Sequence, residues 1–170
     1  MFPIGSIFNK LSRTVRDLSQ KLGKKIIFEA NGSEVEIDKS LIDQLHSPLS
    51  HIIRNCIDHA IELPEVRLQK GKSETGSISL KVENIADNVN IEIRDDGAGL
   101  NRERIIAKAI EKKLIEEGKE LSESQIDNLI FMPGFSTSEQ VTEISGRGVG
   151  MDVVRTTIEQ FGGNIKLSSI

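Results

Sequence analysis

Two stretches near the middle of the chain constrain the fold most, because both alternate apolar and polar side chains. They are SISLKVEN at residues 77–84 and NVNIEIRD at residues 88–95. Strict alternation predicts strands with one face buried and the other exposed to water. Only three residues separate the two stretches, so we expect a hairpin. Its buried face has to be covered by other elements of the chain.

Helical spacing of apolar residues predicts a helix over 6–22, ended by Gly23. Residues 24–30 and 34–37 are strand candidates, and Asn31-Gly32 between them is a strong hairpin signal. Asp38 is a good N-cap for a helix that runs to about Glu62, in two pieces split at Pro48.

The second half of the sequence is mostly helical. Residues 63–76 are expected to form a loop, and the stretch from about 115 to 148 is the expected mobile region. Hairpins outnumber crossovers in this order of elements, which predicts an α+β fold: a two-layer sandwich of one mixed sheet with helices on one face. The remaining expected elements are helices at 101–114, 122–130 and 149–161 and a strand at 164–170.

Composition excludes several classes of function. The 170 residues carry a net charge of −4, which argues against nucleic acid as a partner. Cys56 is the only cysteine, so no intrachain disulfide is possible and a cytoplasmic location fits. No apolar run approaches the roughly 20 residues of a membrane span, and the N-terminus lacks the apolar core of a signal peptide.

A first polar motif lies on the helix around residue 51. At about 100° per residue, His51, Asn55, Asp58 and His59 share one face, opposite an apolar face. Two imidazoles, an amide and a carboxylate can coordinate a hard cation and contact phosphate. The alternative is an ordinary solvated helix face. The apolar face comprises Leu49, Ile52, Ile53, Cys56 and Ala60.

A second motif, DDGAGL at 95–100, follows the strand that ends at Asp95. Its carboxylate can accept a hydrogen bond from an exocyclic amine, while Gly97 and Gly99 let the backbone approach a flat ligand. The alternative is a simple turn, since Asp and Gly are common turn residues.

A third motif places Gly146, Gly148 and Gly150 directly before a helix, where backbone N–H groups can bind phosphate. The alternative is a flexible loop. Two other phosphate loops are excluded. A dinucleotide fingerprint needs glycine where Met151 stands, and a P-loop ending at Gly71-Lys72-Ser73 needs glycine where Val66 stands.

Together the three motifs resemble the ATP-binding domain of the histidine kinase, gyrase, heat-shock and mismatch-repair ATPase superfamily. More narrowly, the chain is similar to the catalytic domain of CheA-type chemotaxis histidine kinases. The resemblance covers essentially all 170 residues. It rests on HxxRNxxDHxIE at 51–62, DDGxGL at 95–100 and PGFSTxExVTEISGRGVGMDVV at 133–154.

For the first motif, the resemblance implies a site for Mg-ATP. Asn55 would hold Mg²⁺, and His51 would stand beside the γ-phosphate and accept a proton from the attacking imidazole. Arg54 and His59 would lie near the phosphates. Asp58 would orient a neighbour or reach a metal-bound water.

For the other two motifs, the resemblance implies that Asp95 accepts from the adenine amine and that Gly97 and Gly99 wrap the base. Lys108 would meet phosphate. The rest of the nucleotide-binding set would belong to a lid that closes over the triphosphate: Phe135, Ser136, Thr137, Gly146, Arg147, Gly148, Val149, Gly150 and Met151.

The implied reaction transfers the γ-phosphate to a histidine on a separate phosphotransfer domain, because no histidine of this chain is followed by an acidic residue. Expected partners are that phospho-accepting domain, dimerisation and receptor-coupling domains, a coupling protein, chemoreceptors and a response regulator. Nucleic acid and membrane insertion are not expected.

The sequence departs from the family pattern at two places. Ala60 replaces a glycine on the apolar face, with little expected effect. The family continues with a further glycine-threonine motif and a last strand after residue 170. A missing strand would weaken nucleotide binding or favour an edge-to-edge dimer. Two other functions therefore remain open: a non-catalytic nucleotide-binding scaffold, and an ATP hydrolase, although hydrolases usually place glutamate where His51 stands.

Overall fold

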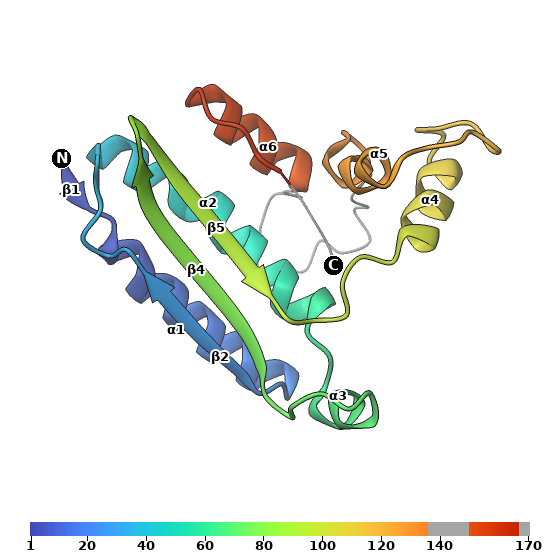
Figure 1. Cartoon of the computed structure of the whole chain (residues 1–170), viewed down its shortest axis with the longest axis horizontal. Coiled ribbons are helices and arrows are strands. Elements are labelled where there is room, and N and C mark those ends of the chain that lie inside the picture. Colours follow the sequence, from blue (N-terminus) through green and yellow to red (C-terminus); the bar gives the residue numbers. More distant parts are fainter. Residues whose placement is uncertain (136–149, 167–170) are drawn as a thin grey trace. The chain divides into compact units, whose positions relative to one another are not determined.

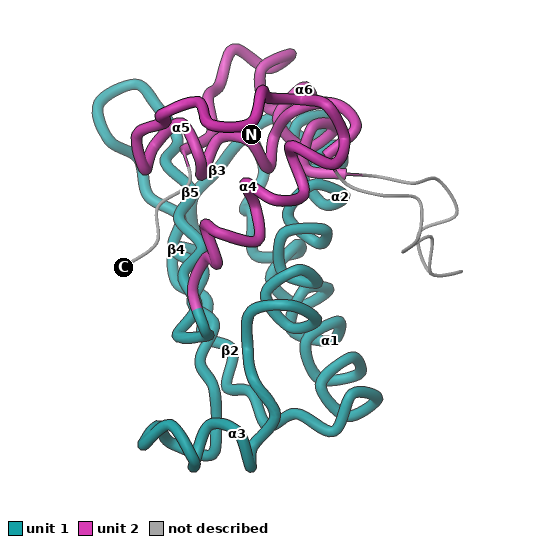
Figure 2. The backbone as a smooth tube through the Cα atoms, turned by 90° about the vertical axis from the view of Figure 1, so that its right-hand side faces the viewer, with its two compact units in different colours: residues 1–98 teal, residues 99–170 magenta. Residues whose placement is uncertain are grey.

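The computed structural model describes residues 1–135 and 150–166. Its chain divides into two compact units, Met1–Ala98 and Gly99–Ile170, shown in different colours in Figure 2. No helix in these described ranges is both long and apolar enough to cross a membrane.

The first unit is a three-stranded mixed sheet with its long helices on one face (Figure 1). The strand order is β2-β4-β5, with β2 parallel to β4 and β4 antiparallel to β5. The predicted hairpin of two alternating strands is confirmed as β4 and β5, joined at Ile85 and Asn88. The first unit contains β1 (Phe2–Pro3), α1 (Gly5–Leu22), β2 (Ile26–Asn31), β3 (Glu36–Ile37), α2 (Lys39–Asn55), the π-helix η1 (Cys56–Ala60), α3 (Pro64–Gln69), β4 (Gly76–Ile85) and β5 (Asn88–Asp95).

The core of the first unit follows from the predicted periodicities. Alternate residues of β4 are buried, and α1 packs against both α2 and β2. The hydrophobic face of α1 therefore covers the apolar face of the sheet. Buried side chains of this core include Ile7, Leu11, Val15, Ile53, Ile78, Leu80 and Val82.

The expected hairpin at Asn31-Gly32 is wrong. Strand β2 pairs with β4 through a crossover that contains α2, and β3 pairs with β1 at the N-terminus. Gly32 has φ +95°, and a Cβ built there would lie 1.9 Å from the carbonyl oxygen of Val82. The glycine thus permits close contact with β4 rather than a reversal into β3.

Two further expectations about the first unit need correction. Helix α2 runs through Pro48 without a break, as one helix from Lys39 to Asn55. The stretch expected to be a loop contains the short helix α3, which starts with Pro64 at its first position, where proline loses no hydrogen bond.

The second unit is helical in its described part. It contains α4 (Arg102–Glu111), α5 (Glu123–Asn128), the 3₁₀ turn η2 (Leu129–Phe131) and α6 (Met151–Gln160). The expected helices at 101–114, 122–130 and 149–161 are confirmed with shorter bounds. Residues 164–166 of the expected last strand are not in a strand, and 167–170 lie outside the described residues. A small core joins α4, α5 and η2 through Ile105, Ala109, Ile126, Leu129 and Phe135.

Candidate functional site

The C-terminal end of α2 carries the first group of candidate residues. His51, Arg54 and Asn55 are half-buried on its last turns. Leu49 and Ile53 on the same turns are buried in the core, so the helix cannot rotate without losing apolar contacts. The polar residues are therefore presented from a rigid helix end.

Directly after Asn55 the helix widens into the π-helix η1, closed by a hydrogen bond from the Ile61 N–H to the Cys56 carbonyl at 2.8 Å. A π turn of this kind is rare and is frequent at functional sites. One common polar face was predicted from a spacing of 100° per residue. This spacing does not apply beyond Asn55, where the chain forms the π turn. Asp58 and His59 are both exposed, with Oδ2 and Nε2 3.5 Å apart.

Lys24, on the loop after α1, caps this π turn. Its Nζ donates to the carbonyl oxygens of Ile57 at 2.6 Å and Asp58 at 3.0 Å. Partial burial lowers the pKa of Lys24, against the opposing charges of Asp58 and Glu62. This lysine was not identified from the sequence, because its contact with the carbonyl oxygens of residues 57 and 58 depends on the tertiary fold.

The second motif turns sharply at the end of β5 and rests on the end of η1. The Ala98 N–H donates to the Ala60 carbonyl at 2.8 Å, and the Gly97 N–H donates to Asp95 Oδ1 at 2.9 Å. A Cβ at Gly97 would lie 2.3 Å from the Ala60 oxygen. Glycine at 97 is thus required by the protein's own backbone, a reason that the sequence alone did not reveal.

Cys56 adds a side-chain link between the two motifs. Burial, together with the charge of Asp95 and a side-chain hydrogen bond to it, raises the pKa of the Cys56 thiol to about 12. The thiol therefore stays protonated at neutral pH, beside the Asp95 carboxylate. Cys56 is buried, as its place on the apolar face predicted, but its contact with Asp95 was not foreseen.

A buried ion cluster lies on the other side of the turn. Arg67 of α3 is 2% exposed and donates through Nη1 to Glu62 Oε1 at 3.2 Å and through Nη2 to Asp96 Oδ2 at 3.0 Å. Its Nε donates to the Ser73 carbonyl at 2.7 Å. The Ser77 N–H donates to the second oxygen of Asp96 at 2.8 Å. One arginine thus joins four segments of the first unit.

Lys72 completes the cluster. Its Nζ donates to Glu62 Oε2 at 3.0 Å and to the carbonyl oxygens of Asp96 at 3.2 Å and Gly97 at 2.8 Å. Burial by itself would raise the pKa of Glu62, but a backbone hydrogen bond and the charges of Lys72 and Arg67 outweigh it, and the pKa is lowered. Arg67 and Lys72 lie in the stretch expected to be a polar loop, so neither was identified from the sequence.

In the second unit, α4 holds the residue that was expected to meet phosphate. The ammonium group of Lys108 lies 4.9 Å from the ring centroid of Phe135, a cation–π distance. One turn further, Lys112 Nζ donates to the Gly134 carbonyl at 2.9 Å. Lys108 of α4 therefore contacts the Phe135 ring, and Lys112, the residue that follows α4, holds the backbone at Gly134.

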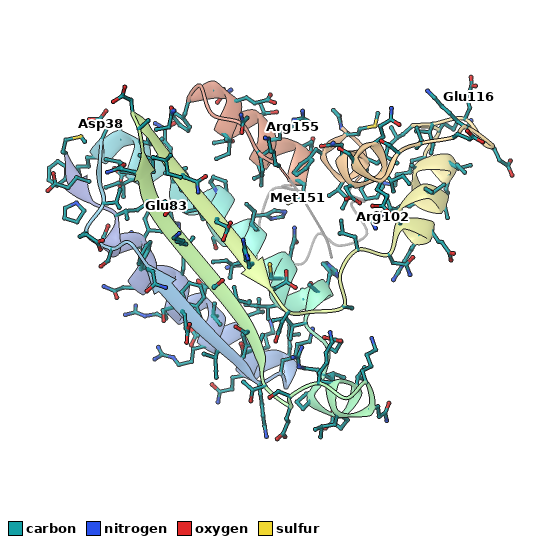
Figure 3. The ribbon with its side chains drawn as sticks, in the orientation of Figure 1. Asp38, Glu83, Arg102, Glu116, Met151 and Arg155 are labelled. Carbon is teal, nitrogen blue, oxygen red and sulfur yellow. The ribbon has the colours of Figure 1, made fainter. Side chains whose placement is uncertain are left out.

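Other side chains brace the same unit (Figure 3). Arg102, at the start of α4, makes two hydrogen bonds to Asp127 of α5, at 3.0 and 3.1 Å. Arg155 of α6 lies 5.6 Å from the ring centroid of Phe131. These contacts fix α4, α5 and α6 within the unit.

Of the glycine-rich candidates, Gly150 and Met151 are described. Gly150 is extended, with φ −91° and ψ 176°, and caps α6, whose first residue is the buried Met151. Gly99 has φ +75°. The remaining candidates of this group lie outside the described residues: Ser136, Thr137, Gly146, Arg147, Gly148 and Val149.

The described residues contain no group of three or more His, Cys, Asp or Glu side chains that could hold a metal ion. The donors at the end of α2 are of another kind: the amide of Asn55 and the exposed carboxylate of Asp58. Oxygen donors in small number suit Mg²⁺, which keeps several waters and takes further ligands from substrate phosphates.

Comparison with known proteins agrees with these motifs. A family model described as "Histidine kinase-, DNA gyrase B-, and HSP90-like ATPase" matches residues 44–170. The "Chemotaxis protein CheA" of Bacillus subtilis (strain 168) and that of Salmonella typhimurium (strain LT2) are each 48% identical over 99% of this chain and 25% of their own length. The chain thus spans about a quarter of the length of these curated relatives.

Among solved structures, the histidine kinase domain from the Erythrobacter litoralis EL346 blue-light activated histidine kinase resembles this fold. The TM-score is 0.54, with 13% identity, over 99% of this chain and 60% of that chain. At this identity the likeness concerns the fold alone. The predicted mixed sheet with helices on one face is confirmed.

Proposed function

The chain belongs to the histidine kinase-, DNA gyrase B- and HSP90-like ATPase family, and on this premise we propose that residues 1–170 form the ATP-binding catalytic domain of a chemotaxis-type histidine kinase. The domain binds Mg-ATP and transfers the γ-phosphate to a histidine on a separate phosphotransfer domain. The observation that carries the proposal is the direct connection between the Asn55 end of α2 and the Asp95 turn. It consists of the Ala98–Ala60 backbone hydrogen bond at 2.8 Å and of the electrostatic interaction between the Cys56 thiol and the Asp95 carboxylate.

Asp95 is the proposed adenine-recognising residue. One of its carboxylate oxygens accepts from the Gly97 N–H, which leaves lone pairs on the other for an exocyclic amine. Guanine carries a carbonyl in place of that amine, and two acceptors would then face each other. The site should therefore prefer ATP to GTP, because an unpaired polar group at a recognition site costs more than a lost contact. Gly97 and Gly99 would let the backbone follow the base.

Asn55 is the proposed magnesium ligand, through its amide oxygen. Asn55 would hold Mg²⁺, which would supply neutralisation of the charge that develops during transfer. Arg54 and His59 would contact the phosphates, and Asp58 would orient a neighbour or a metal-bound water. Their places on the last turn of α2 and on η1 put all four within nine residues of His51.

His51 is the proposed proton acceptor. It stands one helical turn before Asn55, on the rigid end of α2. In phosphoryl transfer the protein contributes mainly positioning and charge neutralisation. A neutral His51 would take the proton that the attacking imidazole releases as its nitrogen bonds to phosphorus. The leaving group is ADP.

The second unit would supply the lid. Phe135 lies at its described start and Gly150 and Met151 at its described end, while Lys108 on α4 would meet phosphate. Between them, Ser136, Thr137, Gly146, Arg147, Gly148 and Val149 would contact the triphosphate in the closed state. Partners would be the phospho-accepting domain and, in a longer protein, dimerisation and receptor-coupling domains, a coupling protein, chemoreceptors and a response regulator, in the cytoplasm.

Calorimetric titration with ADP, ATP and GTP, with and without Mg²⁺, tests the proposal. The wild-type chain should bind adenine nucleotides selectively, and Mg²⁺ should strengthen the binding of ATP. Asp95→Asn should lose most of the binding, while Asp87→Asn, at the exposed turn between β4 and β5, should not. Transfer of labelled phosphate to an isolated phosphotransfer domain, lost in His51→Ala, would then establish the reaction. Folded wild-type protein that binds no nucleotide would overturn the proposal.

A further inference from the structure

Three carbonyl and carboxylate groups around the Asp95 turn converge on one ammonium group. Lys72 Nζ lies 2.8 Å from the Gly97 oxygen, 3.2 Å from the Asp96 oxygen and 3.0 Å from Glu62 Oε2. Its side chain is 32% exposed. An ammonium group has three donors, and each has an acceptor here.

The peptide unit between Asp96 and Gly97 is held at both ends. The Gly97 N–H donates to Asp95 Oδ1 at 2.9 Å, and the Asp96 carbonyl accepts from Lys72 Nζ and from Arg67, each at 3.2 Å. Lys72 Nζ also donates to the next carbonyl, that of Gly97, at 2.8 Å. Rotation of the Asp96–Gly97 peptide would therefore break the bond from Lys72 to the Asp96 carbonyl and turn the Gly97 N–H away from the Asp95 carboxylate. Lys72 thus acts on Asp95 through one intervening residue.

Lys72 is itself held in place by the buried part of the cluster. Its N–H donates to the Arg67 carbonyl at 2.9 Å, and Glu62, which binds its ammonium group, is 7% exposed and also binds Arg67. Arg67 also pairs with Asp96 at 3.0 Å and thereby holds the residue next to Asp95. A displacement of the Asp95 turn would therefore separate charged groups of this cluster from their hydrogen-bond partners.

We infer that Lys72 is a positioning residue for adenine recognition: it orients the Asp95 carboxylate by holding the Asp96–Gly97 peptide. This inference rests on the proposed function. It adds a determinant of base selectivity that does not touch the nucleotide.

The test compares ADP with IDP, whose base carries a carbonyl in place of the adenine amine. Wild type should prefer ADP. In Lys72→Met, affinity for ADP should fall about tenfold, the size of one charge-assisted hydrogen bond, while affinity for IDP should change less than about twofold. Lys72→Arg, which keeps several donors, should recover most of the ADP preference. Lys72→Gln, with one amide donor group, should fall between them and serves if the methionine variant does not fold.

Lys70→Met is the matched control. Lys70 Nζ approaches the same oxygen of Glu62 at 3.6 Å from a half-exposed position, so its removal changes the charge by the same amount. Its ADP:IDP ratio should equal that of wild type. Melting temperature, measured for all variants, reports any purely structural effect.

Two outcomes would overturn the inference. The first is an unchanged ADP:IDP ratio in folded Lys72→Met or Lys72→Gln, which would leave Lys72 a stabilising residue only. The second is an equal loss of selectivity in Lys70→Met, which would point to charge rather than to the Asp96–Gly97 peptide. Wild-type protein without any preference for ADP would instead refute the proposed function, so the two failures can be told apart.

Discussion

Both units contain an arginine bound to carboxylates, but the two arginines do different work. In the first unit, Arg67 is almost fully buried and contacts groups in three separate segments, at residues 62, 73 and 96. In the second unit, Arg102 is 29% exposed and pairs with the buried Asp127 of a single neighbouring helix. The first cluster determines where a loop lies, whereas the second joins two helices that already share an apolar core.

The difference follows from what surrounds each arginine. A buried charge has no water to replace a lost partner, so its partners have to be in place whenever the unit is folded. A partly exposed charge can exchange a carboxylate for water at small cost. Removing a charged partner should therefore lower the free energy of unfolding more in the first unit than in the second.

The largest effect is expected for Arg67→Met. It leaves the buried Glu62 without one of its cations, and breaking a buried pair costs about 3–5 kcal/mol of unfolding free energy. Urea unfolding followed by circular dichroism measures this. Arg16→Met, which removes an arginine 73% exposed beside Asp17, is the control and should be nearly neutral. A loss below about 1 kcal/mol at Arg67 would mean that water reaches the cluster.

Because Glu62 titrates, the contribution of the buried cluster to the free energy of unfolding depends on pH. The pKa of Glu62 is lowered in the folded state, so its contribution is present above the ordinary value of 4.5 and is lost as pH falls through the folded-state pKa. Glu62→Gln should therefore cost about 1.5–3 kcal/mol at pH 7, and less and less below pH 4.5. Unfolding curves from pH 7 to pH 3 measure the difference. A constant difference across that range would contradict the sign.

A smaller effect is expected in the second unit for Asp127→Ala. Arg102 is left without its buried partner, but water can solvate it, so we expect a loss of about 1–2 kcal/mol. Hydrogen exchange of the amides of α4 and α5 measures it locally. Glu123→Ala is the matched control, because Glu123 approaches the same arginine at 3.8 Å and is 82% exposed. Equal effects of the two substitutions would remove the contrast between buried and exposed partners.

The sequence predicted what depends on local periodicity. The hairpin of β4 and β5 and the helix α1 follow from apolar spacing, and the three motifs identify the family. The predictions from the sequence were wrong where contacts between distant segments determine the local structure. Asn31-Gly32 has the composition of a hairpin turn, yet Gly32 serves contact with Val82, which is fifty residues away.

The parts of the candidate site that were missed have the same origin. Arg67 and Lys72 look like surface residues of a polar stretch, and only the fold brings them to Asp96 and Gly97. The π turn after Asn55 likewise has no periodicity of its own in the sequence. Motifs identify side chains that meet a ligand, whereas side chains that hold those residues become visible only through tertiary contacts.

The smallest expected effect concerns how helices end in the two units. Helix α1 closes with hydrogen bonds from Gly23 to Gln20 and from Lys24 to Ser19, and α4 closes in the same way, from Lys113 to Ile110 and from Leu114 to Ala109. Both Gly23 (φ +67°) and Lys113 (φ +59°) are left-handed, a conformation that suits glycine.

Lys113→Gly should therefore stabilise the second unit by about 0.5–1 kcal/mol, because the left-handed strain outweighs the added freedom of the unfolded chain. Gly23→Ala is the mirror experiment in the first unit. A Cβ at Gly23 meets nothing within 4 Å, so its cost of about 1 kcal/mol comes from the backbone alone. Thermal unfolding of both variants measures the pair. Destabilisation by Lys113→Gly would show that the lysine side chain contributes more than its backbone costs, and that α4 ends where it does because of contacts rather than backbone preference.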